Sequence, residues 1–294
     1  MKNTIFKGFA TALVTPMTST GVDYDTLARF IDFQIENGIN ALVAVGTTGE
    51  SATLEPDEQR QVIRFTVEKV AGRVPVVAGT GTNDTSHVLR NTVNACQAGA
   101  DAVLVVTPYY NKATQNGLIA HFTAVADAST KPVILYNVPG RTGCNLLPKT
   151  VAKLAEHPNI VGIKEATGNM AQMVELVHLC GDKLDIYSGE DGLVTMLLGA
   201  GGIGVISVVA NIMPEYMHTM VKTFLDGDQK TAWDMQIKVL DLVNALFCEV
   251  NPIPVKEAMC MMGYDVGRCR MPLSPLNEKN KALLREVLEK HNMI

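Results

Sequence analysis

Short apolar runs alternate with longer amphipathic segments from the N-terminus to about residue 225. The runs are rich in β-branched residues, whereas in the segments between them apolar residues recur every three or four positions, as at Leu27, Phe30 and Ile31. The first pattern predicts buried strands and the second predicts helices that pack on them. We expect strands at residues 8–14, 41–45, 74–78, 102–106, 132–136, 160–164, 184–188 and 202–206.

Eight strand–helix alternations favour a (β/α)8 TIM barrel over an open, doubly wound sheet. An open sheet that binds dinucleotides carries a glycine-rich phosphate turn after its first strand, and residues 14–18 contain no such turn. The glycine-rich stretch at 199–204 leads into a strand and does not open a helix, which argues against a dinucleotide fingerprint there. The predicted fold class is therefore α/β, with a closed barrel of parallel strands.

Strand patterns end near residue 225, and the remaining sequence predicts helices only. Residues 230–250, 252–262 and 277–292 have Met, Leu, Val and Ala on repeating faces, and prolines interrupt the loop before the last helix. We therefore divide the chain into a catalytic barrel at 1–225 and a C-terminal helical domain at 226–294. No flexible linker separates them, so we expect the helices to pack on the barrel as an appendage.

Composition and charge exclude several classes of protein. Of 294 residues, 47% are hydrophobic and the formal net charge is −5, without a basic cluster, which argues against a nucleic-acid partner. No apolar run approaches the roughly 18 residues needed to cross a bilayer, and no signal peptide is evident, so we expect a cytoplasmic protein. The six cysteines form no CxxC pair, and we expect reduced thiols and no metal site.

Lys164 ends the predicted sixth strand, where a buried apolar run gives way to a cation. A lysine is rarely buried without a partner, because removing its charge from water costs free energy. Two interpretations follow from this stretch alone. Lys164 is either a solvated strand-end residue paired with Glu165, or an amine that a functional site requires.

The barrel prediction favours the second interpretation, because catalytic groups collect at the carboxyl ends of barrel strands. This rule brings Lys164 near Tyr136, Arg141 and the Thr47-Thr48 turn. A partly desolvated amine attacks a carbonyl to form a Schiff base, which supports carbon–carbon bond chemistry without a metal or an organic cofactor. Tyr136 suits proton transfer, the threonine turn suits a small carboxylate, and Arg141 suits a second carboxylate. Singly, each of these residues also has an ordinary role in a turn or at a strand end.

Four ordered motifs extend this picture: GTTGES at 46–51, YNVPGRTG at 136–143, GIKEATG at 162–168 and GVISV at 204–208. In this order and spacing they resemble the 4-hydroxy-tetrahydrodipicolinate synthases, or dihydrodipicolinate synthases, of the pyruvate-dependent class I aldolase superfamily. The resemblance covers essentially the whole chain. It implies condensation of pyruvate with aspartate 4-semialdehyde, the first committed step of diaminopimelate and lysine biosynthesis, with no cofactor beyond a covalent Schiff base.

The resemblance also implies a role for each matching residue. Lys164 would form the Schiff base with pyruvate, and Tyr136 would shuttle protons with the help of Thr47. Tyr110 would complete the proton relay from across a tight dimer interface, in a homo-oligomer that is commonly a tetramer built as a dimer of such dimers. The substrate-binding residues would be Thr48 for the pyruvate carboxylate, Arg141 for the semialdehyde carboxylate, and Gly189 and the carbonyl of Ile206 as pocket lining.

Two alternatives stay open beside this reading. One is another pyruvate-dependent class I lyase or aldolase, such as an N-acetylneuraminate lyase, although Thr47 and Arg141 favour the synthase. The other is a barrel that binds a small acid without catalysis.

The resemblance further places a possible allosteric site for lysine at Ser51, Ala52, Gly81, Asn83, His87 and Tyr109. This chain has Pro56 and Gln59 where an inhibited pattern has two histidines, and His87 where that pattern has an acidic residue. Since an acidic group would bind the effector's side-chain ammonium, we expect inhibition by lysine to be weak or absent.

Overall fold

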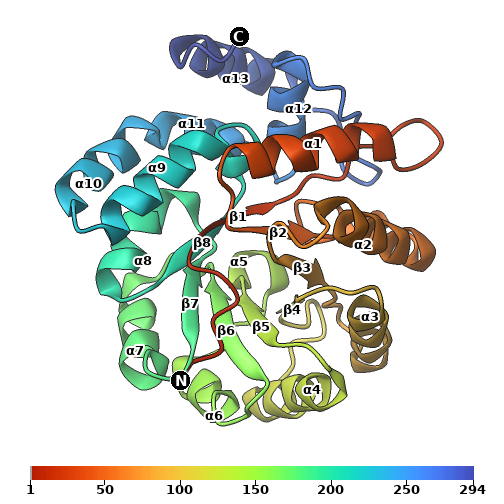
Figure 1. Cartoon of the computed structure of the whole chain (residues 1–294), viewed down its shortest axis with the longest axis vertical. Helices are drawn as coiled ribbons and strands as arrows, with labels where there is room; N and C mark the ends of the chain where they lie inside the picture. The colour runs from red at the N-terminus through yellow and green to blue at the C-terminus, as the bar shows by residue number, and fades with distance from the viewer. Residues whose placement is uncertain (1) are drawn as a thin grey trace.

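The computed structural model describes residues 2–294 and contains a closed barrel of parallel strands surrounded by helices (Figure 1). The strands are β1 (Gly8–Ala12), β2 (Ala41–Ala44), β3 (Val76–Gly79), β4 (Ala102–Val106), β5 (Val133–Asn137), β6 (Ile160–Glu165), β7 (Asp185–Ser188) and β8 (Gly204–Ser207). They follow one another around the barrel in chain order, and β8 closes it against β1. The predicted fold class is confirmed, and each expected strand overlaps an observed one.

Helices follow the strands, and most of them cover the outside of the barrel (Figure 1). They are α1 (Tyr24–Glu36), α2 (Pro56–Val70), α3 (Thr85–Gln97), α4 (Gln115–Ala128), α5 (Pro139–Thr142), α6 (Pro148–Leu154), α7 (Met170–Cys180), α8 (Val194–Ala200) and α9 (Pro214–Leu225). Several begin at a side chain that caps free backbone N–H groups: Asp23 does so for α1, Asp84 for α3 and Thr114 for α4. Local sequence thus sets where these helices begin, while burial of their apolar faces holds them on the strands.

Four helices follow the barrel: α10 (Gln229–Lys238), α11 (Leu240–Leu246), α12 (Ile253–Met261) and α13 (Glu278–Lys290). The single helix expected at 230–250 was therefore wrong. The chain leaves helical geometry at Val239, which is buried, so that α10 packs on α8 and α9 while α11 turns toward α12 and α13. No glycine or proline marks this break, because tertiary packing and not local propensity causes it.

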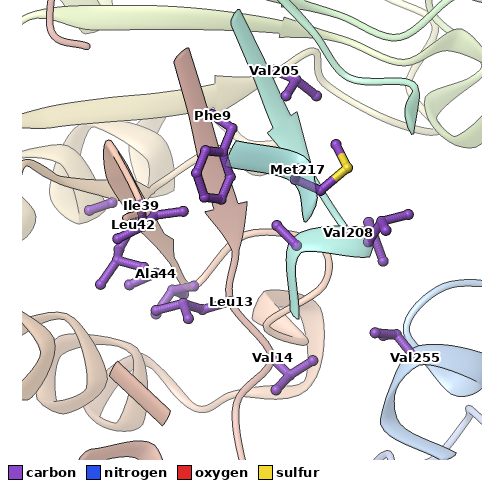
Figure 2. Packing of buried hydrophobic residues seen from close by; sticks show 14 of the residues in the cluster. Phe9, Leu13, Val14, Ile39, Leu42, Ala44, Val205, Val208, Met217 and Val255 are labelled. Carbon is purple, nitrogen blue, oxygen red and sulfur yellow. The ribbon is translucent and has the colours of Figure 1, made fainter. Parts of the chain in front are cut away.

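Buried side chains form one layer inside the barrel and another between the strands and the helices. Figure 2 shows part of the outer layer, with Phe9 of β1, Leu42 of β2 and Val205 of β8 packed together. Val255 of α12 belongs to the same cluster. The C-terminal helices therefore share the hydrophobic core of the barrel. The division at residue 225 stays a prediction.

A buried ion pair also joins the C-terminal helices to the barrel. The Nζ atom of Lys256 lies 2.8 Å from Oε1 of Glu50, which follows β2, and it also donates to the carbonyl oxygens of Thr15 and Arg268. The second carboxylate oxygen of Glu50 accepts from the backbone N–H of Arg270 at 2.8 Å. These bonds pin the loop after β2 to the C-terminal segment at the carboxyl ends of the strands. None of the helices in residues 2–294 has the length and apolar character needed to cross a membrane.

Candidate active site

Lys164 lies on β6, inside the barrel near the carboxyl ends of the strands. It is in register with Tyr136 of β5 and Tyr187 of β7, and only 6% of its surface is exposed. Its Nζ atom lies 4.5 Å from the centroid of the Tyr136 ring. Glu165 points away from it and makes its own hydrogen bonds, so the interpretation of Lys164 as a solvated residue paired with Glu165 was wrong.

The environment of Lys164 favours its neutral, nucleophilic form. Burial lowers the pKa of the amine to about 8, although the nearby carboxylates of Asp191 and Glu190 act to raise it. With this pKa about 10% of the amine is neutral at pH 7, compared with about 0.03% for an unperturbed lysine. The site can therefore supply the free base that attack on a carbonyl requires.

Tyr136 is protonated in the same surroundings. Burial raises the pKa of its phenol to about 12, against smaller opposing effects of the Arg141 charge and of a hydrogen bond from the Thr47 side chain. A phenol this close to Lys164 can give a proton to a leaving hydroxyl and take one back. The pair thus combines a nucleophile with a proton donor.

A cavity of approximately 290 Å³ opens above the pair. Most of the predicted site residues line it: Thr47, Thr48, Tyr136, Arg141, Lys164 and Gly189. Two predicted residues do not. Ile206 lies in the cluster inside the barrel, and Val208, two residues further on, lines the cavity instead. Tyr110 is 88% exposed and lies outside the lining.

Asn251 lines the cavity and was not predicted from the sequence. It belongs to the segment between α11 and α12, and its side-chain Nδ2 donates to Oγ1 of Thr48 at 2.9 Å. Its backbone oxygen accepts from Nη1 of Arg141 at 3.2 Å. One residue of the C-terminal helical region thus contacts both groups that were expected to bind carboxylates. The signal available in the sequence was a polar residue directly before a proline in an otherwise apolar helical region.

The segment after β7 supplies the remaining wall. A Cβ atom on Gly189 would lie 2.9 Å from Cε of Lys164, so only glycine allows this close approach. Glu190 lines the cavity, and burial raises the pKa of its carboxyl. The next residue, Asp191, is buried and accepts from the backbone N–H groups of Val208 and Val209.

Glu165, whose role the sequence left open, holds the ends of β5 and β6. Its carboxylate accepts from the backbone N–H of Thr167 at 2.7 Å, and the side chain of Asn137 lies 3.4 Å from its other oxygen. Asn137 in turn forms hydrogen bonds with Asn145 and Leu146 in the loop beyond Arg141.

Cys144 in that loop is buried, and burial raises the pKa of its thiol, so its thiolate is disfavoured.

A second cavity of approximately 290 Å³ adjoins the first, and both are lined by Thr47 and Arg141. Four of the predicted allosteric residues line it, namely Ser51, Ala52, Gly81 and Tyr109, as does Gln59. Asn83 and His87 do not, and the His87 side chain is exposed. Across residues 2–294 no three His, Cys, Asp or Glu side chains gather in a way that could hold a metal ion.

A buried lysine of lowered pKa beside a protonated tyrosine, at the mouth of a (β/α)8 barrel, is an arrangement suited to the class of barrel enzymes that form Schiff bases. Comparison with known proteins narrows the class. The model of the dihydrodipicolinate synthetase family matches residues 5–291. The 4-hydroxy-tetrahydrodipicolinate synthase of Acetivibrio thermocellus is 50% identical over 294 residues, which are 100% of both chains.

Solved structures agree with this result. The chloride-inhibited dihydrodipicolinate synthase of Acinetobacter baumannii, crystallised with pyruvate, matches with a TM-score of 0.96 and 45% identity over 99% of this chain and 100% of that one. A variant described as the first monomeric dihydrodipicolinate synthase matches with a TM-score of 0.97 and 42% identity over 99% and 98%. The chain therefore belongs to the dihydrodipicolinate synthetase family.

Proposed function

We propose that the chain condenses pyruvate with aspartate 4-semialdehyde through a Schiff base on Lys164, which gives 4-hydroxy-tetrahydrodipicolinate. The observation that carries this proposal is the buried Lys164 amine, with a pKa of about 8, next to the protonated phenol of Tyr136. The product belongs to the diaminopimelate and lysine pathway, and we expect the enzyme to act in the cytoplasm. Family membership disfavours the sialic-acid lyase and the non-catalytic barrel.

The reaction follows from these two groups. The neutral amine of Lys164 attacks the ketone carbon of pyruvate, and Tyr136 supplies the proton with which water leaves as the imine forms. Loss of a proton from the pyruvate methyl group gives an enamine, whose carbon attacks the aldehyde. The amino group of the semialdehyde then attacks the imine carbon, closes the ring and releases Lys164. Because the imine itself is the electron sink, no metal or organic cofactor takes part.

Carboxylate binding is assigned to Thr48 for pyruvate and to Arg141 for the semialdehyde. Both line the cavity, and Thr48 is buried whereas Arg141 is exposed, which suits a substrate that enters second at Arg141. Thr47 lies beside Tyr136 and lowers the pKa of its phenol in part, which supports a place in the proton relay. Gly189 and Val208 line the same cavity, and Val208 takes the place expected for Ile206.

Tyr110 is assigned to the active site of a partner subunit. Its ring is 88% exposed, and its backbone has a φ of 74°, a left-handed conformation that is strained for a tyrosine. An exposed aromatic ring held in a strained turn suits a residue that inserts into a second copy of the chain. We propose a homo-oligomer of tight dimers, probed by the oligomeric state of the Tyr110→Ala protein.

Weak control by lysine is supported by the second cavity. Its lining contains one carboxylate, that of Glu50, and both oxygens of that group are occupied by Lys256 and the N–H of Arg270. No lining carboxylate is free for an effector's ammonium group. Titration with lysine at fixed substrate should leave the rate unchanged into the millimolar range, and sub-millimolar inhibition would contradict this assignment.

Turnover of pyruvate with different aldehydes tests the proposed function. We expect activity with aspartate semialdehyde and none with N-acetylmannosamine, and the reverse preference would contradict the proposed function.

Replacing Arg141 by alanine removes a charge-assisted hydrogen-bond donor, so the KM for the semialdehyde should rise roughly tenfold or more while pyruvate is still trapped on Lys164. Arg64→Ala, an exposed arginine paired with Glu68, is the matched control and should behave as wild type.

A further inference from the structure

Asn251 stands out because nine-tenths of it is buried and it still lacks a hydrogen-bond partner for one polar atom. It is 6% exposed, and its Oδ1 has no partner among the residues that the structure describes. Asn211, also buried, shows the usual arrangement: its Oδ1 accepts from Val14, and its Nδ2 donates to Ala12 and Val208. An unsatisfied buried amide costs stability, so packing alone does not account for Asn251.

Its position connects Asn251 to the residues assigned to substrate binding. Asn251 lies where the C-terminal helical region reaches the barrel mouth, and it touches the residues assigned to both substrate carboxylates. The side chain reaches Thr48, whereas the main chain reaches Arg141. The two links are therefore separable, because a substitution changes the first and leaves the second in place.

In the hydrogen bond between Asn251 and Thr48, the amide is the donor and the hydroxyl is the acceptor. A threonine hydroxyl carries one hydrogen and two acceptor lone pairs. Nδ2 of Asn251 donates to Oγ1 of Thr48 at 2.9 Å and so occupies a lone pair. Within residues 2–294 the structure shows no other hydrogen bond for this hydroxyl, so its hydrogen is free to point into the cavity that Thr48 lines. A hydroxyl held in this way is a donor, as binding of a carboxylate requires.

We propose that Asn251 is a positioning residue: it keeps the Thr48 hydroxyl oriented as a donor toward the pyruvate carboxylate, and it sets pyruvate affinity without touching the reacting atoms. This inference rests on the proposed function, because it takes pyruvate as the anion that Thr48 binds. It places one residue of the C-terminal helical region in the active site. All the other residues assigned to chemistry or carboxylate binding lie in the barrel.

Asn251→Asp is the sharpest test, because it keeps the shape and reverses the hydrogen bond. A carboxylate accepts from the Thr48 hydroxyl, turns its hydrogen out of the cavity and adds a negative charge beside the pyruvate carboxylate. We expect the KM for pyruvate to rise roughly tenfold or more and the KM for the semialdehyde to change less than about threefold, since the main-chain bond to Arg141 remains. At saturating pyruvate, borohydride should still trap the adduct on Lys164.

Two further variants separate positioning from folding. Asn251→Ala removes the unsatisfied atom together with one hydrogen bond, so it should shift Tm by less than about 3 °C and still raise the pyruvate KM severalfold. Asn211→Leu is the control, because both polar atoms of the Asn211 side chain are hydrogen-bonded. It should lower Tm clearly without a selective change in the pyruvate KM.

An unchanged pyruvate KM in Asn251→Asp, or equal rises in both KM values together with a large loss of Tm, would overturn the inference. Wild-type protein that fails to trap pyruvate at Lys164 would instead overturn the proposed function, so the two failures are distinguishable.

Discussion

The reactivity of Lys164 is set by opposing effects on a single amine. Burial disfavours the charged form, while Asp191 and Glu190 favour it, and burial is the larger effect, so the pKa falls to about 8. Burial also raises the pKa values of the Glu190 and Asp191 carboxyls. The environment thus brings the pKa of the Lys164 amine close to physiological pH, so that part of the amine is present as the neutral nucleophile.

Gly189 controls the space around that amine. A methyl group there would lie 2.6 Å from Cβ of Ala166 and 2.9 Å from Cε of Lys164, closer than such atoms pack. Gly189→Ala should therefore displace the lysine side chain, at a cost of about 1–3 kcal/mol, and slow adduct formation with pyruvate roughly tenfold or more. The measurement is the rate of borohydride trapping at fixed pyruvate.

Gly140→Ala is the matched control, because this glycine also lines the cavity but a Cβ there meets nothing within 4 Å. It should trap pyruvate at the wild-type rate. Equal rates for the Gly189 and Gly140 variants would show that close packing at Gly189 does not hold the amine in place.

Sequence patterns located Lys164 and Tyr136 because both end a recognisable strand, and the barrel rule then placed them together. They did not locate Asn251, because it lies in a short connection between helices, where spacing carries no information about distant contacts. The stretch around Lys164 alone could not decide between the solvated and the functional interpretation, since burial depends on how distant loops close over the mouth, and only the barrel prediction favoured the second.

At the level of elements, register decides which side chains meet. Tyr136 of β5 pairs with Lys164 of β6, and Asn137 pairs with Glu165 one residue further on. The first pair faces the interior and holds the two residues proposed to carry out the chemistry, while the second connects the strand ends to the following loops. Strand periodicity made these positions predictable. The break between α10 and α11 was not predictable, because Val239 leaves the helix to satisfy packing and no local residue requires it.

At the level of the whole molecule, the C-terminal helices complete the mouth of the barrel. Val255 shares the barrel core, Lys256 neutralises Glu50 beneath the threonine turn, and Asn251 contacts Thr48 and Arg141. The sequence predicted that these helices pack on the barrel, since no linker precedes them. It did not predict that they hold the loop that carries Thr48 and Glu50, because those contacts join residues about 200 positions apart.

The central claim is that Lys164 is the nucleophile that captures pyruvate, and borohydride trapping followed by peptide mass analysis tests it most directly. We predict a reduced pyruvate adduct on the peptide that contains Lys164 in the wild-type protein. The adduct should be lost in Lys164→Met and retained in Lys153→Met, a control on helix α6 outside the cavity. No adduct in the wild type, or an adduct on another lysine, would contradict the account.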